Sequence, residues 1–203
     1  MKIGACHRGA LALVGVLAFT FAARAAAPKG WILAGSKPAN YETGIDATVN
    51  YNAHPAAYLK SKSSVVVGDE GFGTLMQSFR ADQYRGARVR FRASAKSETV
   101  SQWAGLWMRI DKGSEVVGFD NMQSRPLKGT ADWQSFDVVL DVPKDATSIS
   151  FGVLLTGSGS VWVSNASFET VGDDVALTDK PLDDNRPKGA GQPGLSRIRT
   201  GTD

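Results

Sequence analysis

The chain has 203 residues, a length typical of one domain, or of one domain with tails. Its formal net charge of +3 is accounted for by Lys2, Arg8 and Arg24, so the rest of the chain is neutral. A nucleic-acid partner is excluded on this ground because it requires a basic surface, and the composition argues equally against a collagen, a coiled coil, a multi-span membrane protein or a disulfide scaffold.

The first 25 residues have the three-part layout of a secretory signal peptide. Lys2 and Arg8 precede an apolar run over Ala10–Ala23, and Ala23-Arg24-Ala25 fits the small-x-small cleavage pattern. The run is shorter than the roughly 20 residues that a membrane span needs, so we expect cleavage after Ala25 rather than a lasting anchor. We predict an exported protein, periplasmic or secreted, with no stable membrane insertion after cleavage.

Cysteine and histidine are scarce. Cys6 and His7 lie in the predicted signal, which leaves the mature chain with His54 and no cysteine. Disulfides, thiol catalysis and cysteine-ligated zinc are therefore excluded. With one histidine left, a Ser-His-Asp triad and a two-histidine metal site also lack their usual residues. His54 precedes Pro55 in a stretch typical of a loop, so we predict a solvated or structural role for it.

From Trp31 to Val171 the hydrophobic period is two, which indicates strands. The clearest alternation runs over 87–97, where Arg88, Arg90, Arg92 and Lys96 share the face that we expect to be solvated. Further strands are predicted over 57–62, 73–80, 104–111, 116–121, 135–142, 148–156 and 161–170. The sequence therefore predicts an all-β fold, an antiparallel β-sandwich or jelly roll over residues 28–172.

The connections and the C-terminal end complete this outline. The Gly-Ser-Gly segment at 157–159 predicts a hairpin between the last two strands. Residues 173–203 contain no aromatic side chain and are rich in Pro, Gly and mixed charge, so we expect a disordered tail.

The block over 133–171 carries a family resemblance. It contains, in order, a strand that begins with Trp, a Val-Pro turn, the alternating strand SISFGVLL, a Gly-Ser-Gly connection and a closing VWV strand. This layout resembles carbohydrate-binding-module-like jelly rolls of the galactose-binding-like superfamily. The segments 30–46, 71–79, 103–111 and 119–130 are similar to a bacterial jelly-roll domain of extracytoplasmic proteins and of modules attached to transcription regulators. The sequence offers no helix-turn-helix segment.

The resemblance implies a sheet face on which aromatic rings stack on sugars and polar side chains bind hydroxyl groups. In the strand 103–111, alternation places Trp103, Trp107, Arg109 and Asp111 together on one face, which we predict to be the ligand floor. In the alternative interpretation, the two tryptophans only cover the sheet, and Arg109 and Asp111 form ion pairs.

Three further residues are added to the predicted ligand site. Asp120 and Asn121 end a strand and are expected to line the same cleft, or alternatively to cap an Asx-type turn. Gln77 lies among apolar neighbours, so its amide needs a partner, either the backbone or a ligand.

No cofactor is expected. Modules of the resembled fold often carry a structural calcium ion, and Glu42 and Asp46 offer carboxylates. Where these modules commonly place Asp in the closing strand, however, this chain has Ser164 and Asn165. This departure weakens the calcium inference.

The leading hypothesis is an exported, non-catalytic module that binds a carbohydrate or a polyol-like ligand. The alternatives are a glycan hydrolase using two carboxylates among Asp111, Asp120, Glu42 and Asp46, and an envelope protein-interaction module with the tail as its tether.

Overall fold

The computed structural model describes residues 27–62 and 71–178, whose regular structure is almost entirely β-strand. The strands are β1 (Ile32–Gly35), β2 (Tyr41–Tyr51), β3 (His54–Ser61), β4 (Phe72–Arg80), β5 (Arg88–Lys112), β6 (Glu115–Asp120), β7 (Leu127–Asp141), β8 (Ser148–Thr156) and β9 (Ser160–Val171). A short 3-10 turn, η1 (Pro38–Asn40), separates β1 from β2. Within these ranges, no helix is long and apolar enough to cross a membrane. The predicted signal peptide lies outside the described residues.

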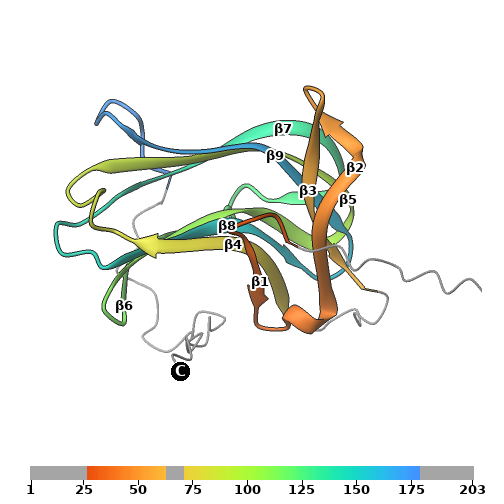
Figure 1. The fold of residues 1–203 in the computed structure, drawn as a ribbon, viewed down its shortest axis with the longest axis horizontal. Coiled ribbons are helices and arrows are strands. Elements are labelled where there is room, and N and C mark those ends of the chain that lie inside the picture. The colour runs from red at the N-terminus through yellow and green to blue at the C-terminus, as the bar shows by residue number, and fades with distance from the viewer. Residues whose placement is uncertain (1–26, 63–70, 179–203) are drawn as a thin grey trace, which may run out of the picture.

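The strands pair only in antiparallel fashion, in the order β1-β4-β8-β5-β9-β3-β2, with β6 and β7 also paired to β5. The sheet folds over into two layers (Figure 1). The upper layer contains β7, the first half of β5, and β9, and β3 and β2 continue it around one end. The lower layer contains β6, the second half of β5, β8, β4 and β1. The fold is therefore the all-β antiparallel sandwich that the sequence predicts.

Strand β5 belongs to both layers. The sequence predicts two strands over 87–97 and 104–111, whereas the structure has a single strand of 25 residues. Its first half pairs with β9 and β7, and its second half pairs with β8 and β6. The intervening polar residues keep extended backbone because Val100 and Ala104 still pair with β7 across register shifts. Polarity at this point therefore marks a passage between layers and not the end of a strand.

The core lies between the layers and is built by the inward residues of every long strand. Phe91, Leu106 and Leu155 are at most 1% exposed and belong to one continuous apolar cluster. Phe151 of β8 lies at the centre of an aromatic group, with ring centroids 4.7 Å from Phe91 and 5.8 Å from Trp31. Burial of this surface is the main driving force for a chain that holds no cysteine after residue 6.

Two predictions about connections are wrong. The Gly-Ser-Gly segment at 157–159 does not close a hairpin, because β8 pairs with β4 and β5 whereas β9 pairs with β3 and β5. The segment instead carries the chain from one layer to the other. The loop predicted around His54 and Pro55 is the beginning of β3, where these residues pair with Tyr51 and Asn50. Proline is tolerated there because it lies at the start of the strand.

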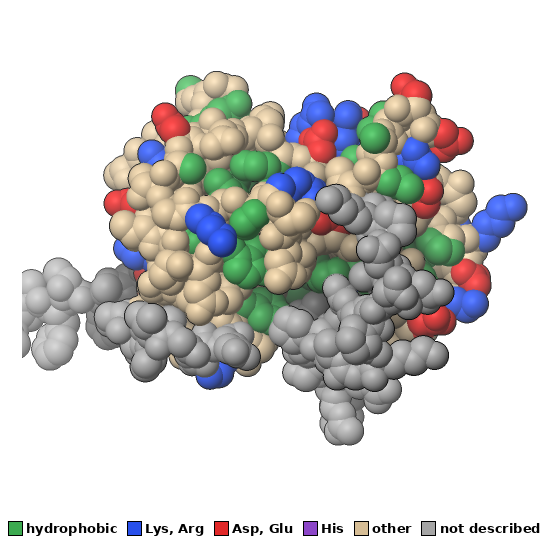
Figure 2. Space-filling view, turned by 180° about the vertical axis from the view of Figure 1, so that it is seen from behind, with side chains coloured by type: hydrophobic (Ala, Val, Ile, Leu, Met, Phe, Trp, Pro, Cys, Tyr) green, Lys and Arg blue, Asp and Glu red, His purple; other side chains and the backbone are tan. Residues whose placement is uncertain are grey.

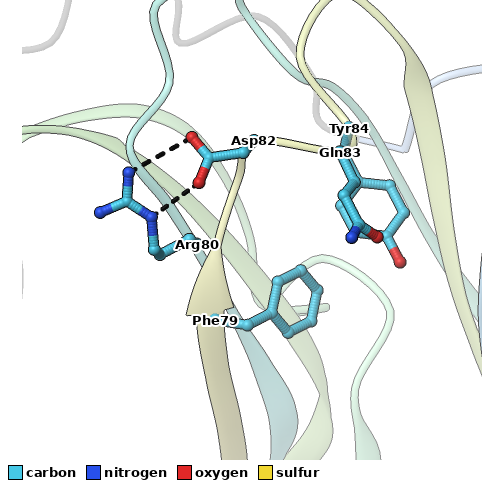
Figure 3. Close-up of a pocket in the computed structure, with 5 residues that line it drawn as sticks. All are labelled: Phe79, Arg80, Asp82, Gln83 and Tyr84. Atoms are coloured by element: carbon cyan, nitrogen blue, oxygen red, sulfur yellow. Dashed lines mark hydrogen bonds and ion pairs between the residues drawn. The ribbon is translucent and has the colours of Figure 1, made fainter.

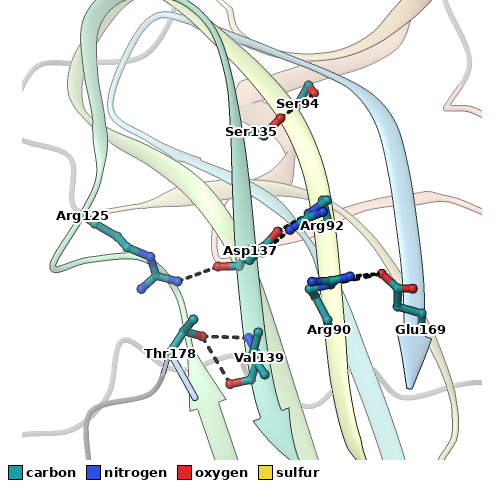
Figure 4. A network of polar contacts seen from close by, with 9 residues as sticks. All are labelled: Arg90, Arg92, Ser94, Arg125, Ser135, Asp137, Val139, Glu169 and Thr178. Atoms are coloured by element: carbon teal, nitrogen blue, oxygen red, sulfur yellow. Dashed lines mark hydrogen bonds and ion pairs between the residues drawn. The ribbon is translucent and has the colours of Figure 1, made fainter. Parts of the chain in front are cut away.

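The basic face predicted on the first half of β5 carries ion pairs. Arg88 pairs with Asp141 at 2.8 Å and Arg92 with Asp137 at 2.6 Å, both across to β7. On the other side, Arg90 pairs with Glu169 of β9 (Figure 4). The view of Figure 2 likewise shows basic side chains interspersed with acidic ones. Such pairs limit the attraction of this face for phosphates.

The start of the predicted tail is attached to the sandwich. Thr178 donates its backbone N–H to the carbonyl of Val139 at 3.1 Å, and its hydroxyl accepts the N–H of Val139 at 2.8 Å. Arg88 binds the carbonyl groups of Asp173 and Val175. Residues 173–178 therefore continue along β7, and the rest of the predicted tail lies outside the described residues.

Replacing Leu106 by alanine tests the importance of β5. Leu106 is 0% exposed, so Leu106→Ala removes buried methyl groups and leaves a cavity, and we expect the free energy of unfolding to fall by about 2–5 kcal/mol. Urea unfolding followed by tryptophan fluorescence measures this loss. Leu177→Ala is the matched control, because Leu177 is 40% exposed and the change should stay within about 0.5 kcal/mol. Equal losses for the two variants would contradict the assignment of the core.

A second prediction concerns acid stability. Asp46 of β2 accepts hydrogen bonds from the hydroxyl group of Thr48, from the indole N–H of Trp162 and from the backbone of Thr48, and these bonds lower its pKa from 3.8 to about 2. A depressed folded-state pKa gives stability that is present above pH 4 and lost as the pH falls toward 2. In Asp46→Asn, thermal unfolding should depend less on pH between about pH 4 and pH 2. Asp173→Asn, at an exposed position, should leave the original slope.

Candidate functional site

The second half of β5 presents two faces, as the alternation in the sequence predicts. Ala104, Leu106, Met108 and Ile110 are 0% exposed and point into the core. The intervening side chains lie on the outer face of the lower layer; they are Trp103, Trp107, Arg109 and Asp111. We refer to the outer side of β1, β4, β8, the second half of β5, and β6 as the outer face.

One half of the outer face is apolar and aromatic. Ala34, Met76, Trp107 and Leu154 come from four different strands and form a buried cluster apart from the main core. Three partly buried aromatic side chains pack against this cluster: Phe72, Trp103 and Phe119. The register explains the grouping, because Trp107 pairs with Gly152, and Gly152 pairs with Met76. A side chain at Gly152 would crowd this row, since its Cβ would lie 2.2 Å from the carbonyl oxygen of Leu75.

The two tryptophans of the outer face differ in accessibility. Trp107 is 2% exposed, and its indole N–H donates to the hydroxyl oxygen of Thr74 at 2.7 Å. Thr74 in turn donates to the carbonyl of Val153 at 2.8 Å. Trp107 is therefore fixed in the sheet and supports the surface, and a ligand could stack on it only after a rearrangement. Trp103 is half-buried, so its ring retains an accessible part.

The other half of the outer face is polar. The guanidinium Nε of Arg109 lies 3.0 and 3.1 Å from the two carboxylate oxygens of Asp111. The hydroxyl of Ser148 is 3.5 Å from the same carboxylate, and Ser150 donates to Ser78 at 2.9 Å. These groups lie directly beside the aromatic half because Arg109 and Trp107 are two residues apart on one strand. The face thus combines apolar rings with a guanidinium, a carboxylate and hydroxyl groups.

Three predicted site residues do not join this arrangement. Gln77 pairs with Phe151 and lies on the inward side of β4, opposite to Met76. Asp120 pairs with Met108, binds Arg125 at 2.7 Å and accepts the N–H of Met122, so it fixes the loop after β6. Asn121 accepts the N–H of Gln123. Both residues of that loop therefore form Asx-type turns, the alternative that the sequence left open.

The carboxylates considered for hydrolysis are likewise dispersed. Asp111 lies on the outer face and pairs with Arg109, whereas Asp120 lies at the inward edge and pairs with Arg125. Glu42 and Asp46 belong to β2, in the upper layer. Among residues 27–62 and 71–178, no group of three or more His, Cys, Asp or Glu side chains could hold a metal ion.

A shallow hollow of about 270 Å³ lies at the end of β4 and is lined by Phe79, Arg80, Asp82, Gln83 and Tyr84 (Figure 3). Its two charged residues bind each other, with Arg80 Nε 2.6 Å from Asp82. The hydrogen bond and the charge of Arg80 lower the pKa of Asp82. The side chains of Arg80 and Asp82 are 81% and 43% exposed, so the hollow would remove little of a ligand from water, which makes it a weak candidate for a site.

Sequence reasoning missed the partners of the tryptophans. Met76 and Leu154 join the aromatic half of the outer face, and no pattern in the sequence singles out Leu154, because it lies inside the apolar run 153–155. For Met76 the signal is the alternation of β4, in which Thr74, Met76 and Ser78 share one face. Phe119 could not be found in this way, because its place depends on its pairing with Arg109 of another strand.

Comparison with known proteins gives one relative by sequence. The chain is 43% identical over 151 residues to a Bacillus subtilis (strain 168) protein named uncharacterized HTH-type transcriptional regulator YbfP. The match covers 74% of this chain and 50% of the relative, so the chain spans about half the length of that protein. No family model matches the chain.

Comparison with solved structures shows the fold. The C-terminal family 22 carbohydrate-binding module of Clostridium thermocellum Xyn10B has a TM-score of 0.51 at 12% identity, covering 71% of this chain and 88% of that one. The CBM22-1 xylan-binding domain of Paenibacillus barcinonensis Xyn10C has a TM-score of 0.50 at 10% identity, covering 73% and 90%. The chain thus has the β-sandwich fold of carbohydrate-binding modules, as the resemblance in the sequence implies.

The support of Trp107 by Thr74 can be tested. Thr74→Val keeps the shape of the side chain but leaves the buried indole N–H without its acceptor, and we expect a loss of about 1–3 kcal/mol in the free energy of unfolding. Urea unfolding measures it. The matched control is Thr170→Val at an exposed position near the end of β9, which should change stability by less than about 0.5 kcal/mol. A loss no larger than that of the control would show that the hydrogen bond does not hold the ring.

Proposed function

We propose that this chain is an exported, non-catalytic binding module for a carbohydrate or a polyol-like ligand, bound on the outer face. The observation that carries the proposal is the division of one sheet face into an aromatic half around Trp103 and a polar half around Arg109 and Asp111. The export part rests on the sequence of residues 1–25.

Sugars have the surface that such a face fits. The C–H side of a pyranose ring is apolar and packs on aromatic rings, and Trp103 supplies the accessible one here. Sugar hydroxyl groups both donate and accept hydrogen bonds, so they can use the guanidinium of Arg109, the carboxylate of Asp111 and the serine hydroxyl groups. The Arg109–Asp111 ion pair also holds these groups in place before the ligand arrives, which reduces the entropy lost on binding.

The structural neighbours support the choice of carbohydrate as ligand class. One is named as a xylan-binding domain, and another as a carbohydrate-binding module whose cleft residues act in ligand binding. Since such likeness establishes the fold and leaves the ligand open, we propose xylan fragments only as the first member of a glycan panel.

The similarity to the Bacillus subtilis regulator indicates that a module of this kind also forms part of a larger protein. The relative is named as a helix-turn-helix-type transcriptional regulator, whereas the described residues of this chain hold no α-helix. We therefore propose that the part shared with the regulator recognises a ligand, and that the regulator couples this recognition to its DNA-binding part. In this chain the predicted signal peptide would place the module outside the cytoplasm.

The test is binding of soluble glycans to the purified full-length chain, read by tryptophan fluorescence and thermal shift. We expect a saturable signal with at least one glycan, and a loss of about tenfold or more in affinity for Trp103→Ala, because stacking on an indole accounts for much of such binding. Arg109→Gln should weaken binding similarly, since it removes the charged donor and frees Asp111.

Trp133→Ala is the matched control. Trp133 is also half-buried, but it lies on β7 of the upper layer and packs on Tyr51, with ring centroids 5.1 Å apart. Its loss should leave glycan affinity within about twofold. A cooperatively folded chain that binds no glycan, or one whose binding is unchanged by Trp103→Ala, would rule out the proposal.

A further inference from the structure

A second, more enclosed space lies at one end of the sandwich, between the two layers. Its volume is about 300 Å³, at the lower end of the range for small-molecule sites. The residues that line it come from the N-terminal segment and from six strands; they are Pro28, Trp31, Ile45, His54, Pro55, Ala57, Leu75, Phe91, Val153, Val163, Ser164, Asn165 and Ala166. We call it the end cavity.

The floor of the end cavity is the hydrophobic core itself. Leu75, Phe91 and Val153 are each 1% exposed and point inward from β4, β5 and β8. The rim is accessible, since Ile45 is 50% exposed and His54 and Asn165 are also exposed. The cavity thus runs from solvent to the centre of the core, and an apolar ligand there would be in contact with core side chains.

Two irregular strands keep this end open. In β9 the register with β5 shifts between Ser164 and Ser167, and Asn165 at the shift has a positive φ of 53°. In β2 the pairing with β3 shifts between Asp46 and Asn50. Bulges of this kind bend strands and are frequent beside binding sites. Here both shifts lie at the rim, since Ile45 directly precedes the shift in β2, and Asn165 and Ala166 lie within the shift in β9.

The lining defines the chemistry of the ligand. Among its described residues there is no Lys, Arg, Asp or Glu side chain, and the polar side chains are those of Trp31, His54, Ser164 and Asn165, of which His54 and Asn165 are exposed at the mouth. We propose that the end cavity is a second binding site, for a small, uncharged and largely apolar molecule with one hydrogen-bonding end. Its apolar part replaces water against the floor, and its polar end meets His54 and Asn165 at the mouth.

The end cavity is separate from the outer face, although the two share strands. Leu75 and Val153 point into the cavity, while their neighbours Met76 and Leu154 point to the outer face. A ligand in the cavity therefore lies on the opposite side of β4 and β8 from a sugar bound near Trp103. The proposal does not depend on the function proposed for the outer face.

The experiment is a titration of the purified full-length chain with N-phenyl-1-naphthylamine, an uncharged probe that fluoresces strongly in apolar surroundings. We expect saturable binding to the folded chain. Ile45→Arg places an unpaired charge at the rim, so we expect the affinity to fall about tenfold or more. Ala57→Phe fills the cavity from β3 and should reduce binding to the same degree.

Ile32→Arg is the matched control, because Ile32 is 47% exposed, close to the 50% of Ile45, and does not line the cavity. It should leave the affinity for the probe within about twofold, and thermal unfolding checks that all variants are folded. A folded wild-type chain that does not bind the probe overturns the proposal. Equal loss of affinity in Ile45→Arg and Ile32→Arg overturns it as well, because the probe would then respond to surface charge and not to the cavity.

Discussion

The structure depends on the backbone pairing of one strand. β5 runs for 25 residues and contributes its first half to the upper layer and its second half to the lower layer. Its backbone groups are paired on both sides along most of this length, first with β9 and β7 and then with β8 and β6. The alignment of the neighbouring strands in both layers therefore depends on β5. The two layers are therefore one hydrogen-bonded sheet, and displacement of β5 would disturb the core and the outer face together.

The core and the candidate site alternate along this strand. Leu106 and Met108 are buried between the layers, and Trp107, between them in sequence, lies in the outer cluster. Successive side chains of a strand point to opposite faces, so burial of Leu106 and Met108 in the core places the indole of Trp107 on the outer face. The same packing explains why the outer face is rigid, since Trp107 is bonded to Thr74 and Arg109 to Asp111 within the protein. Rigidity of this kind suits recognition of a ligand by shape.

Sequence alone predicts the fold class and the grouping of Trp103, Trp107, Arg109 and Asp111, because residues two apart on one strand must share a face. It does not place Gln77 or Asp120, since both depend on register with other strands, and each face of β4 mixes polar and apolar residues. The strands β1 and β2 are absent from the prediction, because the first has four residues and the second mixes Glu, Gly and Asp without clear alternation. The end cavity is assembled from residues of six strands, so no local pattern marks it.

The most direct test of the outer face as the sugar-binding surface is an NMR titration that follows the indole N–H signals of the five tryptophans. Soluble glycan fragments are added to the ¹⁵N-labelled chain, and each signal is assigned with a single Trp→Phe variant. The account predicts that the signals of Trp103 and Trp107 move together and saturate, while those of Trp133 and Trp162, in the upper layer, stay in place. Movement of Trp133 or Trp162 with Trp103 and Trp107 unchanged would contradict it.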